Sequence, residues 1–476
     1  MIAIQPKLPL WKKLVYASGD FGISSTGILR QIFFAIFLTD VVGLDPRLGS
    51  FAALLGVMWD AINDPLVGML SDRVHSRWGR RRPFLLIFAI PFGLSFTLLW
   101  FSPPWESQVA LLLYVMLAFM LADTFSTLVG MPFNALMPEI VPGYDERTSL
   151  MGIRSFFQLS AALVTVIAAP AIVDAALANG LTQQQGYLLT AMVFGLLGSL
   201  PFIVIFFVIR ETADVDETRT LPIGQSLQTA WQNKPFRFAT GFQLFTWSAV
   251  DMVGLILPFY LLYWVAQGNM LMTVSVLGVP LSLESAFLGL LMATSIVFIP
   301  FWSWLAHRSN KRVAYISGLL FWIIVEILLF AVQPGEVSLA LLLGMLAGIG
   351  ISSAYVLPDS IFADVIEWDE LRTRRRQEGV YYGARAFIRK LTGALTIFIA
   401  LQLLGWAGYQ APPEGATSFM QSEQVLMAIR FLIAPFGALL LFGAVVMVWL
   451  YPLTRERHEK ILELLARRKI NAGARM

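Results

Sequence analysis

Two aspartates in one apolar stretch of the chain are the residues best placed to do chemistry. Asp60 and Asp64 are four positions apart within residues 48–71, so a helix projects both carboxylates from one face, with Asn63 on the same side. Carboxylates this close repel each other, and a proton retained on one of them or a bound monovalent cation relieves the repulsion. Carboxylate and amide oxygens suit a hard cation such as Na⁺. The spacing therefore predicts a site for Na⁺ or a proton.

The same pair of aspartates has an alternative, structural interpretation. Asp60 and Asp64 could form salt bridges with basic residues of another apolar stretch, and Arg389 and Lys390 in residues 380–406 are the candidates. The two interpretations are compatible, because a lysine can hold the pair when no cation is bound.

Polar residues at helical spacing mark two further apolar stretches. Asp20 and Ser24 lie one turn apart in residues 15–39, and Trp247 and Asp251 lie one turn apart near the middle of another stretch. Stripes of this kind normally face a bundle interior or a water-filled cavity. We therefore expect these residues to contact a ligand.

Aromatic residues near these stripes have two interpretations. Trp247 and Tyr355 could stack on an apolar or sugar-ring face of a ligand. Tyr260 and Tyr263 are interpreted instead as packing residues or as part of the aromatic belt at a membrane interface.

Composition identifies the elements that must position these residues. The chain has 476 residues, of which 57% are hydrophobic and only 14% charged, with a mean hydropathy of +0.70 and no cysteine. A soluble protein carries about 25% charged residues, so the chain is predicted to be a polytopic membrane protein. The net charge of +3 is too small to suggest nucleic-acid binding. Low charge and absent cysteine also exclude a disordered chain and a disulfide scaffold.

Twelve apolar stretches are long enough to cross a bilayer as helices, which takes about 20 residues each. Their predicted cores are 15–39, 48–71, 84–102, 108–133, 150–173, 185–209, 238–265, 285–305, 314–332, 337–360, 380–406 and 425–450. If these stretches span, 27 lysines and arginines fall on one side of the membrane and only Arg47 on the other. The positive-inside rule then places both termini in the cytoplasm.

The polar interruption after the sixth stretch divides the chain into two sets of six. We predict an N-terminal half at 1–209, a cytoplasmic linker at 210–236, a C-terminal half at 237–452 and a cytoplasmic tail at 453–476. A basic segment follows both the second and the eighth stretch, which is typical of an internal duplication. The predicted fold is all-α: twelve transmembrane helices in the major facilitator architecture, with a substrate site near mid-membrane between the halves.

No motif of an enzyme or of an ATP-driven pump is found in the sequence. It contains no nucleotide-binding P-loop, no metal-site spacing and no hydrolase nucleophile motif. We therefore expect neither an enzyme nor a bound cofactor, apart from Na⁺ or H⁺ as a coupling ion.

Several of these segments resemble the glycoside–pentoside–hexuronide:cation symporters of the major facilitator superfamily. The matching motifs span nearly the whole chain and are Tyr16-Ala-Ser-Gly-Asp-Phe-Gly22, Thr39-Asp-Val-Val-Gly-Leu44, Trp59-Asp-Ala-Ile-Asn-Asp-Pro65, Asp72 through Phe84, Met131 through Glu139, Ala363 through Glu370, and Gly408-Tyr409. The resemblance implies a cation site at Asp60, Asn63, Asp64 and Thr127, with Lys390 beside it.

The resemblance implies a different solute from that of the galactoside-transporting members. Their two sugar-binding aspartates fall on Ser24 and Gly130 in this chain, whereas their arginine of the fifth span corresponds to Arg154 and an aromatic contact to Tyr355. Two carboxylates that accept bonds from vicinal hydroxyls are therefore missing. Asp20, one turn before Ser24, could replace part of that role.

These observations lead to one main functional hypothesis and two alternatives. The main hypothesis is a secondary active symporter that couples Na⁺ or H⁺ entry to uptake of a sugar or glycoside-like solute, with Asp72, Arg73 and Arg80 in a cytoplasmic gate. The first alternative keeps the fold but carries an amphipathic substrate such as a lysolipid, and the second is a non-transporting sensor or scaffold. We expect a monomer in the lipid bilayer of a cell membrane, such as a bacterial inner membrane, with no nucleic-acid partner.

Overall fold

A computed structural model describes most of the chain: residues 8–74, 76–141, 144–210, 231–276, 278–373, 378–413 and 416–453, with a few positions between 456 and 464. Eleven helical segments in this described part are long and apolar enough to cross a membrane. Helix α2, Pro46–Arg73, occupies the remaining predicted span. All twelve predicted spans are therefore helical, and the predicted fold class is confirmed.

The helices begin and end within a few residues of the predicted cores, except where α4, α5 and α11 run on beyond them. The remaining bounds are α1 Leu10–Ile36, α3 Arg82–Leu99, α4 Gln108–Ile140, α5 Tyr144–Ala178, α6 Gln183–Val208, α8 Lys234–Phe259, α9 Leu283–Arg308, α10 Lys311–Ala331, α11 Val337–Thr373, α12 Glu378–Trp406, α13 Glu423–Phe431 and α14 Gly437–Trp449.

Several helices start at a side chain that caps the exposed backbone amides of the first turn. Asp45 accepts a hydrogen bond from the Arg47 amide ahead of α2, and Asn233 and Asn310 cap α8 and α10 in the same way. Thr182 forms a reciprocal capping box with Gln185 at the start of α6. Such caps satisfy amides that have no partner within the helix.

Three π-helical segments interrupt or extend the spans, which the sequence did not predict. The segment Phe37–Val41 (η1) continues α1, Tyr260–Val265 (η2) continues α8, and Leu432–Phe436 (η3) separates α13 from α14. A π-helical turn accommodates an extra residue and is frequent at functional sites. A second unpredicted feature is a hairpin of strands β1, Thr273–Val276, and β2, Val279–Ser282.

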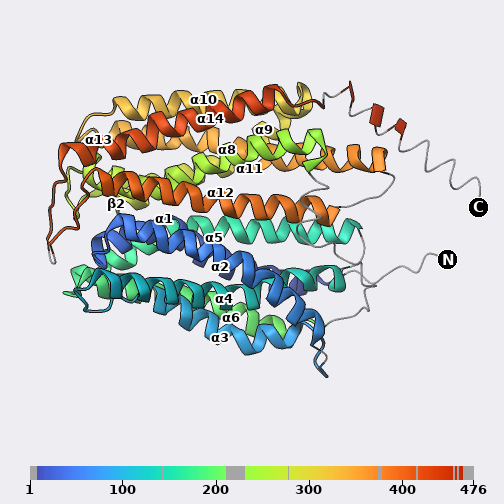
Figure 1. The fold of residues 1–476 in the computed structure, drawn as a ribbon, viewed down its shortest axis with the longest axis horizontal. Helices are drawn as coiled ribbons and strands as arrows, with labels where there is room; N and C mark the ends of the chain where they lie inside the picture. Colours follow the sequence, from blue (N-terminus) through green and yellow to red (C-terminus); the bar gives the residue numbers. More distant parts are fainter. Residues whose placement is uncertain are drawn as a thin grey trace, which may run out of the picture. The chain divides into compact units, whose positions relative to one another are not determined.

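The chain forms two compact units, each described by itself. Unit 1 comprises Met1–Glu217, Leu261–Gly289 and Phe398–Leu426, and unit 2 comprises Thr218–Tyr260, Leu290–Ile397 and Met427–Met476. In unit 1, α1 packs on α5 and α6, and α3 packs on α4 and α6. Figure 1 shows α3, α4 and α6 running alongside one another. In unit 2, α8 packs on α14, and α10 packs on α11 and α14.

These pairings recur between spans that are six apart in chain order. The contacts α1–α6, α3–α4 and α3–α6 correspond to α8–α14, α10–α11 and α10–α14. This recurrence supports a duplicated six-helix unit. The exact division at 1–209, 210–236, 237–452 and 453–476 stays a prediction, and most of the linker and tail lies outside the described residues.

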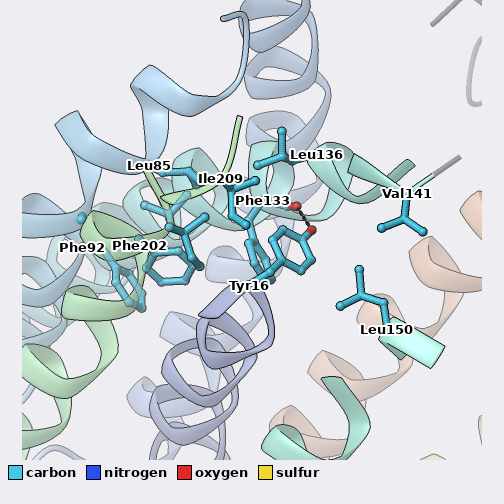
Figure 2. Packing of buried hydrophobic residues seen from close by; sticks show 12 residues of the cluster. Tyr16, Leu85, Phe92, Phe133, Leu136, Val141, Leu150, Phe202 and Ile209 are labelled. Atoms are coloured by element: carbon cyan, nitrogen blue, oxygen red, sulfur yellow. Dashed lines mark hydrogen bonds between the residues drawn. The ribbon is translucent and has the colours of Figure 1, made fainter. Parts of the chain in front are cut away.

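The hydrophobic core of unit 1 is built around Tyr16 and Phe133. Their rings stack with centroids 4.7 Å apart, and the Tyr16 hydroxyl donates to the Phe133 carbonyl at 2.5 Å. The Phe202 ring packs edge-on against Phe133. Leu85 and Phe92 belong to the same cluster of buried residues (Figure 2). A buried tyrosine needs such an acceptor, because an unpaired hydroxyl in an apolar core is costly.

The crossing of α1 and α6 generates the first testable prediction. A Cβ added at Gly22 would lie 2.4 Å from the backbone oxygen of Gly198, which cannot move without displacing the helix. We therefore expect Gly22→Ala to destabilise the protein by about 1–3 kcal/mol, the usual effect of overpacking, measured as a lower Tm in detergent. Gly27→Ala is the matched control on the same helix, because no described atom lies within 4 Å of its added Cβ. Equal Tm values for the two variants would contradict the prediction.

Candidate functional site

The predicted cation-binding residues come together where α2 packs on α4. Asp60, Asn63 and Thr127 are buried, with 9%, 4% and 8% of their surfaces exposed, and Asp64 is half-buried. The Thr127 hydroxyl donates to Asp64 Oδ1 at 3.2 Å, which joins the two helices. One face of α2 and one residue of α4 therefore form a single polar cluster inside unit 1.

The chemistry of this cluster suits a monovalent cation or a proton. It offers carboxylate, amide and hydroxyl oxygens, and Asn63 Nδ2 is buried without a hydrogen-bond partner in the described part of the chain. Nearby, Trp59 Nε1 donates to Thr124 Oγ1 at 2.9 Å, which fixes α2 against α4. Within the described residues, no group of three or more acidic, histidine or cysteine side chains could hold a metal ion. The carboxylates of the cluster are those of Asp60 and Asp64, both on α2.

Asp20 and Arg154, both predicted to contact substrate, form a buried ion pair between α1 and α5. Arg154 donates from Nε and Nη2 to the two Asp20 oxygens at 2.6 and 2.9 Å. The same guanidinium donates to Asn134, and Gln158 donates to Asp20. The Arg154 side chain is only 8% exposed, and the Asp20 side chain only 4%. Ser24, one turn from Asp20, is half-buried.

Asp251, Trp247 and Tyr355, predicted from two different stretches, meet in unit 2. Trp247 of α8 and Tyr355 of α11 pack edge to face with ring centroids 5.5 Å apart. Asp251 accepts two hydrogen bonds from Arg389 of α12, at 2.7 and 2.8 Å. The Arg389 guanidinium also lies over the Trp247 ring, 4.8 Å from its centroid. Arg389, proposed above as a possible partner of Asp60 and Asp64, is thus held by Asp251.

The sequence did not predict a third polar cluster, which centres on Asp40. We placed Asp40 just outside a span, whereas it lies in η1 with 9% of its surface exposed. Tyr263 donates to its Oδ2 at 2.5 Å, Tyr409 donates to its Oδ1, and Thr39 donates to the same oxygen at 2.7 Å. Tyr263 therefore binds a carboxylate and is more than the packing residue that we expected.

The Asp40 cluster joins three distant parts of the chain within unit 1. Tyr409 lies beyond the end of α12, where burial and the charge of Asp40 raise the pKa of its hydroxyl well above the ordinary value. The hydroxyl therefore keeps its proton and serves as a donor to the carboxylate. A cavity of about 860 Å³ lies beside the cluster, with Asp40, Tyr187 and Glu284 in its wall. Asp40 and Tyr409 both stand in motifs that carried the family resemblance, which was the available signal.

Comparison with known proteins assigns the chain to a family. A family model described as MFS/sugar transport protein matches residues 15–455. The chain belongs to this family. It is therefore a multi-pass membrane transporter of the major facilitator superfamily, as the motifs suggested.

Three relatives are similar to this chain over most of its length, and the two whose names give a solute differ in it. An uncharacterized symporter of Synechocystis sp. is 30% identical, with 98% of each chain covered. The sodium-dependent lysophosphatidylcholine symporter 1-A of Danio rerio is 26% identical over 97% of this chain and 89% of its own. The isoprimeverose transporter of Lactiplantibacillus pentosus is 24% identical over 89% of this chain and 84% of its own.

A solved structure agrees on the fold. The bacterial homolog of the human lysosomal transporter Spinster, in an inward-facing conformation, superposes with a TM-score of 0.64. The match covers 94% of this chain and 98% of that one at 12% identity, so the likeness concerns the fold alone.

The cation-binding, substrate-binding and gating roles of the predicted site residues all stay predictions, and for two groups the placement is untested as well. Lys390 lies on α12 within unit 2, whereas the Asp60–Asp64 cluster belongs to unit 1, so their pairing is untested. The side chains of Asp72 and Arg73, at the end of α2, are outside the described part. Arg80 is half-buried in the turn between α2 and α3, and its role in a gate is likewise untested.

The Asp20–Arg154 pair generates the second prediction. Replacing Arg154 with Met leaves Asp20 buried without its counter-charge, which typically costs about 3–5 kcal/mol. We expect a strongly lowered Tm in detergent. The control is Arg47→Ala, which breaks the exposed Asp45–Arg47 pair, where the arginine side chain is 52% exposed, and surface pairs contribute at most about 1 kcal/mol. A Tm loss no larger than that of the control would show that the buried pair is unimportant for stability.

Proposed function

We propose that this chain is a secondary active symporter that couples entry of Na⁺ or H⁺ to uptake of a sugar or glycoside-like solute. The observation that carries the proposal is the α2–α4 cluster, in which Asp60, Asn63 and Thr127 are buried and Thr127 donates to Asp64. Charged residues inside membrane spans are expensive and are usually retained for function. The family description and the isoprimeverose-transporting relative support a sugar-like solute.

Cation binding would act on transport through charge neutralisation. A cation between Asp60 and Asp64 removes the repulsion of the two carboxylates, so the loaded and unloaded clusters favour different arrangements of the helices. If the cation raises solute affinity by some factor, the solute must raise cation affinity by the same factor. Alternating exposure of a doubly loaded site then converts the cation gradient into solute uptake.

Na⁺ is the better supported of the two coupling ions. A proton needs one carboxylate oxygen, whereas Na⁺ also uses neutral oxygens, and Asn63 and Thr127 place an amide and a hydroxyl beside the aspartates. The sodium-dependent relative of Danio rerio supports the same choice.

The coupling proposal predicts the behaviour of Asp64→Asn. Asp64→Asn removes one of the two carboxylate charges that would hold the cation, and a loss of about 1.4 kcal/mol of cation binding is already tenfold in affinity. Na⁺-driven uptake of isoprimeverose by proteoliposomes should therefore fall at least roughly tenfold. The matched control is Asp45→Asn at the start of the same helix, because asparagine caps helices as well as aspartate does. The coupling would be refuted if uptake by wild type did not respond to a Na⁺ or H⁺ gradient. It would also be refuted if Asp64→Asn showed the same gradient-driven uptake as wild type.

A lysolipid is the second candidate substrate, and the Danio rerio relative is the observation that favours it. The two candidates predict different ligands for the purified protein. We expect isoprimeverose plus Na⁺ to raise Tm in a thermal-shift measurement and lysophosphatidylcholine to leave it unchanged. Stabilisation by lysophosphatidylcholine alone would reverse the assignment of the substrate while leaving the cation site standing.

A further inference from the structure

Unit 1 and unit 2 each contain one bidentate arginine–aspartate pair on corresponding spans. The first joins Asp20 of α1 to Arg154 of α5, and the second joins Asp251 of α8 to Arg389 of α12. Helices α1 and α8 are the first spans of the two sets of six, and α5 and α12 are the fifth spans. The two pairs nevertheless differ in exposure and surroundings, which indicates different roles.

The pair in unit 1 has the features of a structural element. Both its side chains are at least nine-tenths buried. The Asn134 side chain accepts a hydrogen bond from the Arg154 guanidinium. The Arg154 Cζ atom lies 5.0 Å from the centroid of the Phe133 ring. Gln158 also donates to Asp20. These contacts leave little surface through which a solute could reach the guanidinium.

The pair in unit 2 is open on the arginine side. The Arg389 side chain is 28% exposed and that of Asp251 only 8%. Charged residues within a span usually face the bundle interior or water rather than hydrocarbon, so we expect the exposed part of the Arg389 side chain to be accessible to a polar ligand. Trp247 lies beneath the Arg389 guanidinium, and Tyr355 packs against the Trp247 ring. Both aromatic side chains are half-buried.

Space for this pair is provided by a glycine. A Cβ added at Gly393, one turn after Arg389 on α12, would lie 2.9 Å from Arg389 Nη1 and 3.2 Å from Asp251 Oδ2. A larger residue at this position would require both charged groups to shift. The pair therefore packs closely against the backbone of α12.

We propose that Arg389 is a specificity-determining residue that donates hydrogen bonds to the hydroxyl oxygens of a neutral sugar, and that Asp251 is its positioning residue. A guanidinium has five N–H donors in a rigid fork, and the two bonds to Asp251 use one donor from each terminal nitrogen. Asp251 cancels the charge of the arginine, so the exposed edge binds hydroxyls without attracting a carboxylate. Trp247 and Tyr355 supply an apolar surface for the C–H face of the ring. This inference rests on the proposed sugar symport and names the class of sugar.

The inference predicts a change of specificity in Asp251→Asn. This variant leaves the positive charge of Arg389 uncompensated, so anionic sugars should compete better than in wild type. The measurement is inhibition of Na⁺-driven isoprimeverose uptake by methyl β-glucopyranoside and by methyl β-glucuronide, which differ in one carboxylate. We expect the ratio of their inhibition constants to shift at least tenfold toward the glucuronide.

Two further variants separate the proposed role from a structural one. Arg389→Lys keeps the charge but loses the fork, so it should weaken inhibition by the neutral glucoside at least tenfold while Tm stays close to that of wild type. Its control is Arg308→Lys, another arginine over a tryptophan ring in unit 2, 5.8 Å from the centroid of Trp304. Asp251→Asn combined with Arg389→Gln removes both charges and should abolish the gain for the glucuronide.

The outcomes distinguish this inference from the proposed function. Absence of cation-driven isoprimeverose uptake by wild type in reconstituted vesicles would overturn the proposed function. Normal uptake by wild type with an unchanged inhibition ratio in Asp251→Asn would overturn the inference alone. If Asp251→Asn does not fold, Arg389→Lys decides: inhibition by the neutral glucoside equal to that of wild type overturns the inference.

Discussion

The Asp20–Arg154 ion pair is the interaction on which the rest of unit 1 depends. Hydrocarbon offers no water to solvate a charge, so a charged side chain within a span is stabilised when it finds a partner of opposite charge on another helix. Arg154 Nε and Nη2 meet both Asp20 oxygens at 2.6 and 2.9 Å, and this contact fixes the register of α5 against α1. Tyr16, one turn before Asp20, then stacks on Phe133 and connects α1 to α4. With α1 held in this way, α6 approaches it closely at the Gly22–Gly198 contact.

The same constraint divides the charged residues into scaffold and site. Where an ion pair is buried, as between Asp20 and Arg154, it stabilises the packing of the two helices that carry it. Where a charged side chain remains partly exposed, as at Arg389, less of its surface is committed to packing. Both kinds occur on the first and fifth spans of the two sets of six, although the two aspartates stand at different heights of their helices.

The sequence is sufficient to predict the spans and the clustering of polar residues on α2, for physical reasons, whereas cation binding by that cluster stays a prediction. Bilayer thickness determines how long an apolar stretch must be, so composition alone locates the helices. Asp60, Asn63 and Asp64 lie on one helix, where periodicity alone places side chains on a common face. Thr127 required the family resemblance, because it comes from α4.

Other contacts could not be predicted, because their partners are distant in the chain. Nothing local shows that Asp40 meets Tyr263 and Tyr409, which are 223 and 369 positions away. Arg389 stands next to the motif residue Lys390 and was considered only as a partner of span 2, whereas it binds Asp251. The β1–β2 hairpin was also missed, since its strands are only four residues each and none of their residues is fully buried.

The long separation between Asp40 and Tyr409 has a consequence for biogenesis. A ribosome adds about 5–20 residues per second, so the 369 residues between the two take roughly 20–70 s to synthesise. Throughout that interval the first span is in the membrane without one of the hydroxyls that bind its carboxylate. Until the eleventh span has been synthesised, Thr39 and Tyr263 are the donors that the chain can offer to this carboxylate. The order of synthesis thus makes the Asp40 cluster one of the last polar contacts of unit 1 to form.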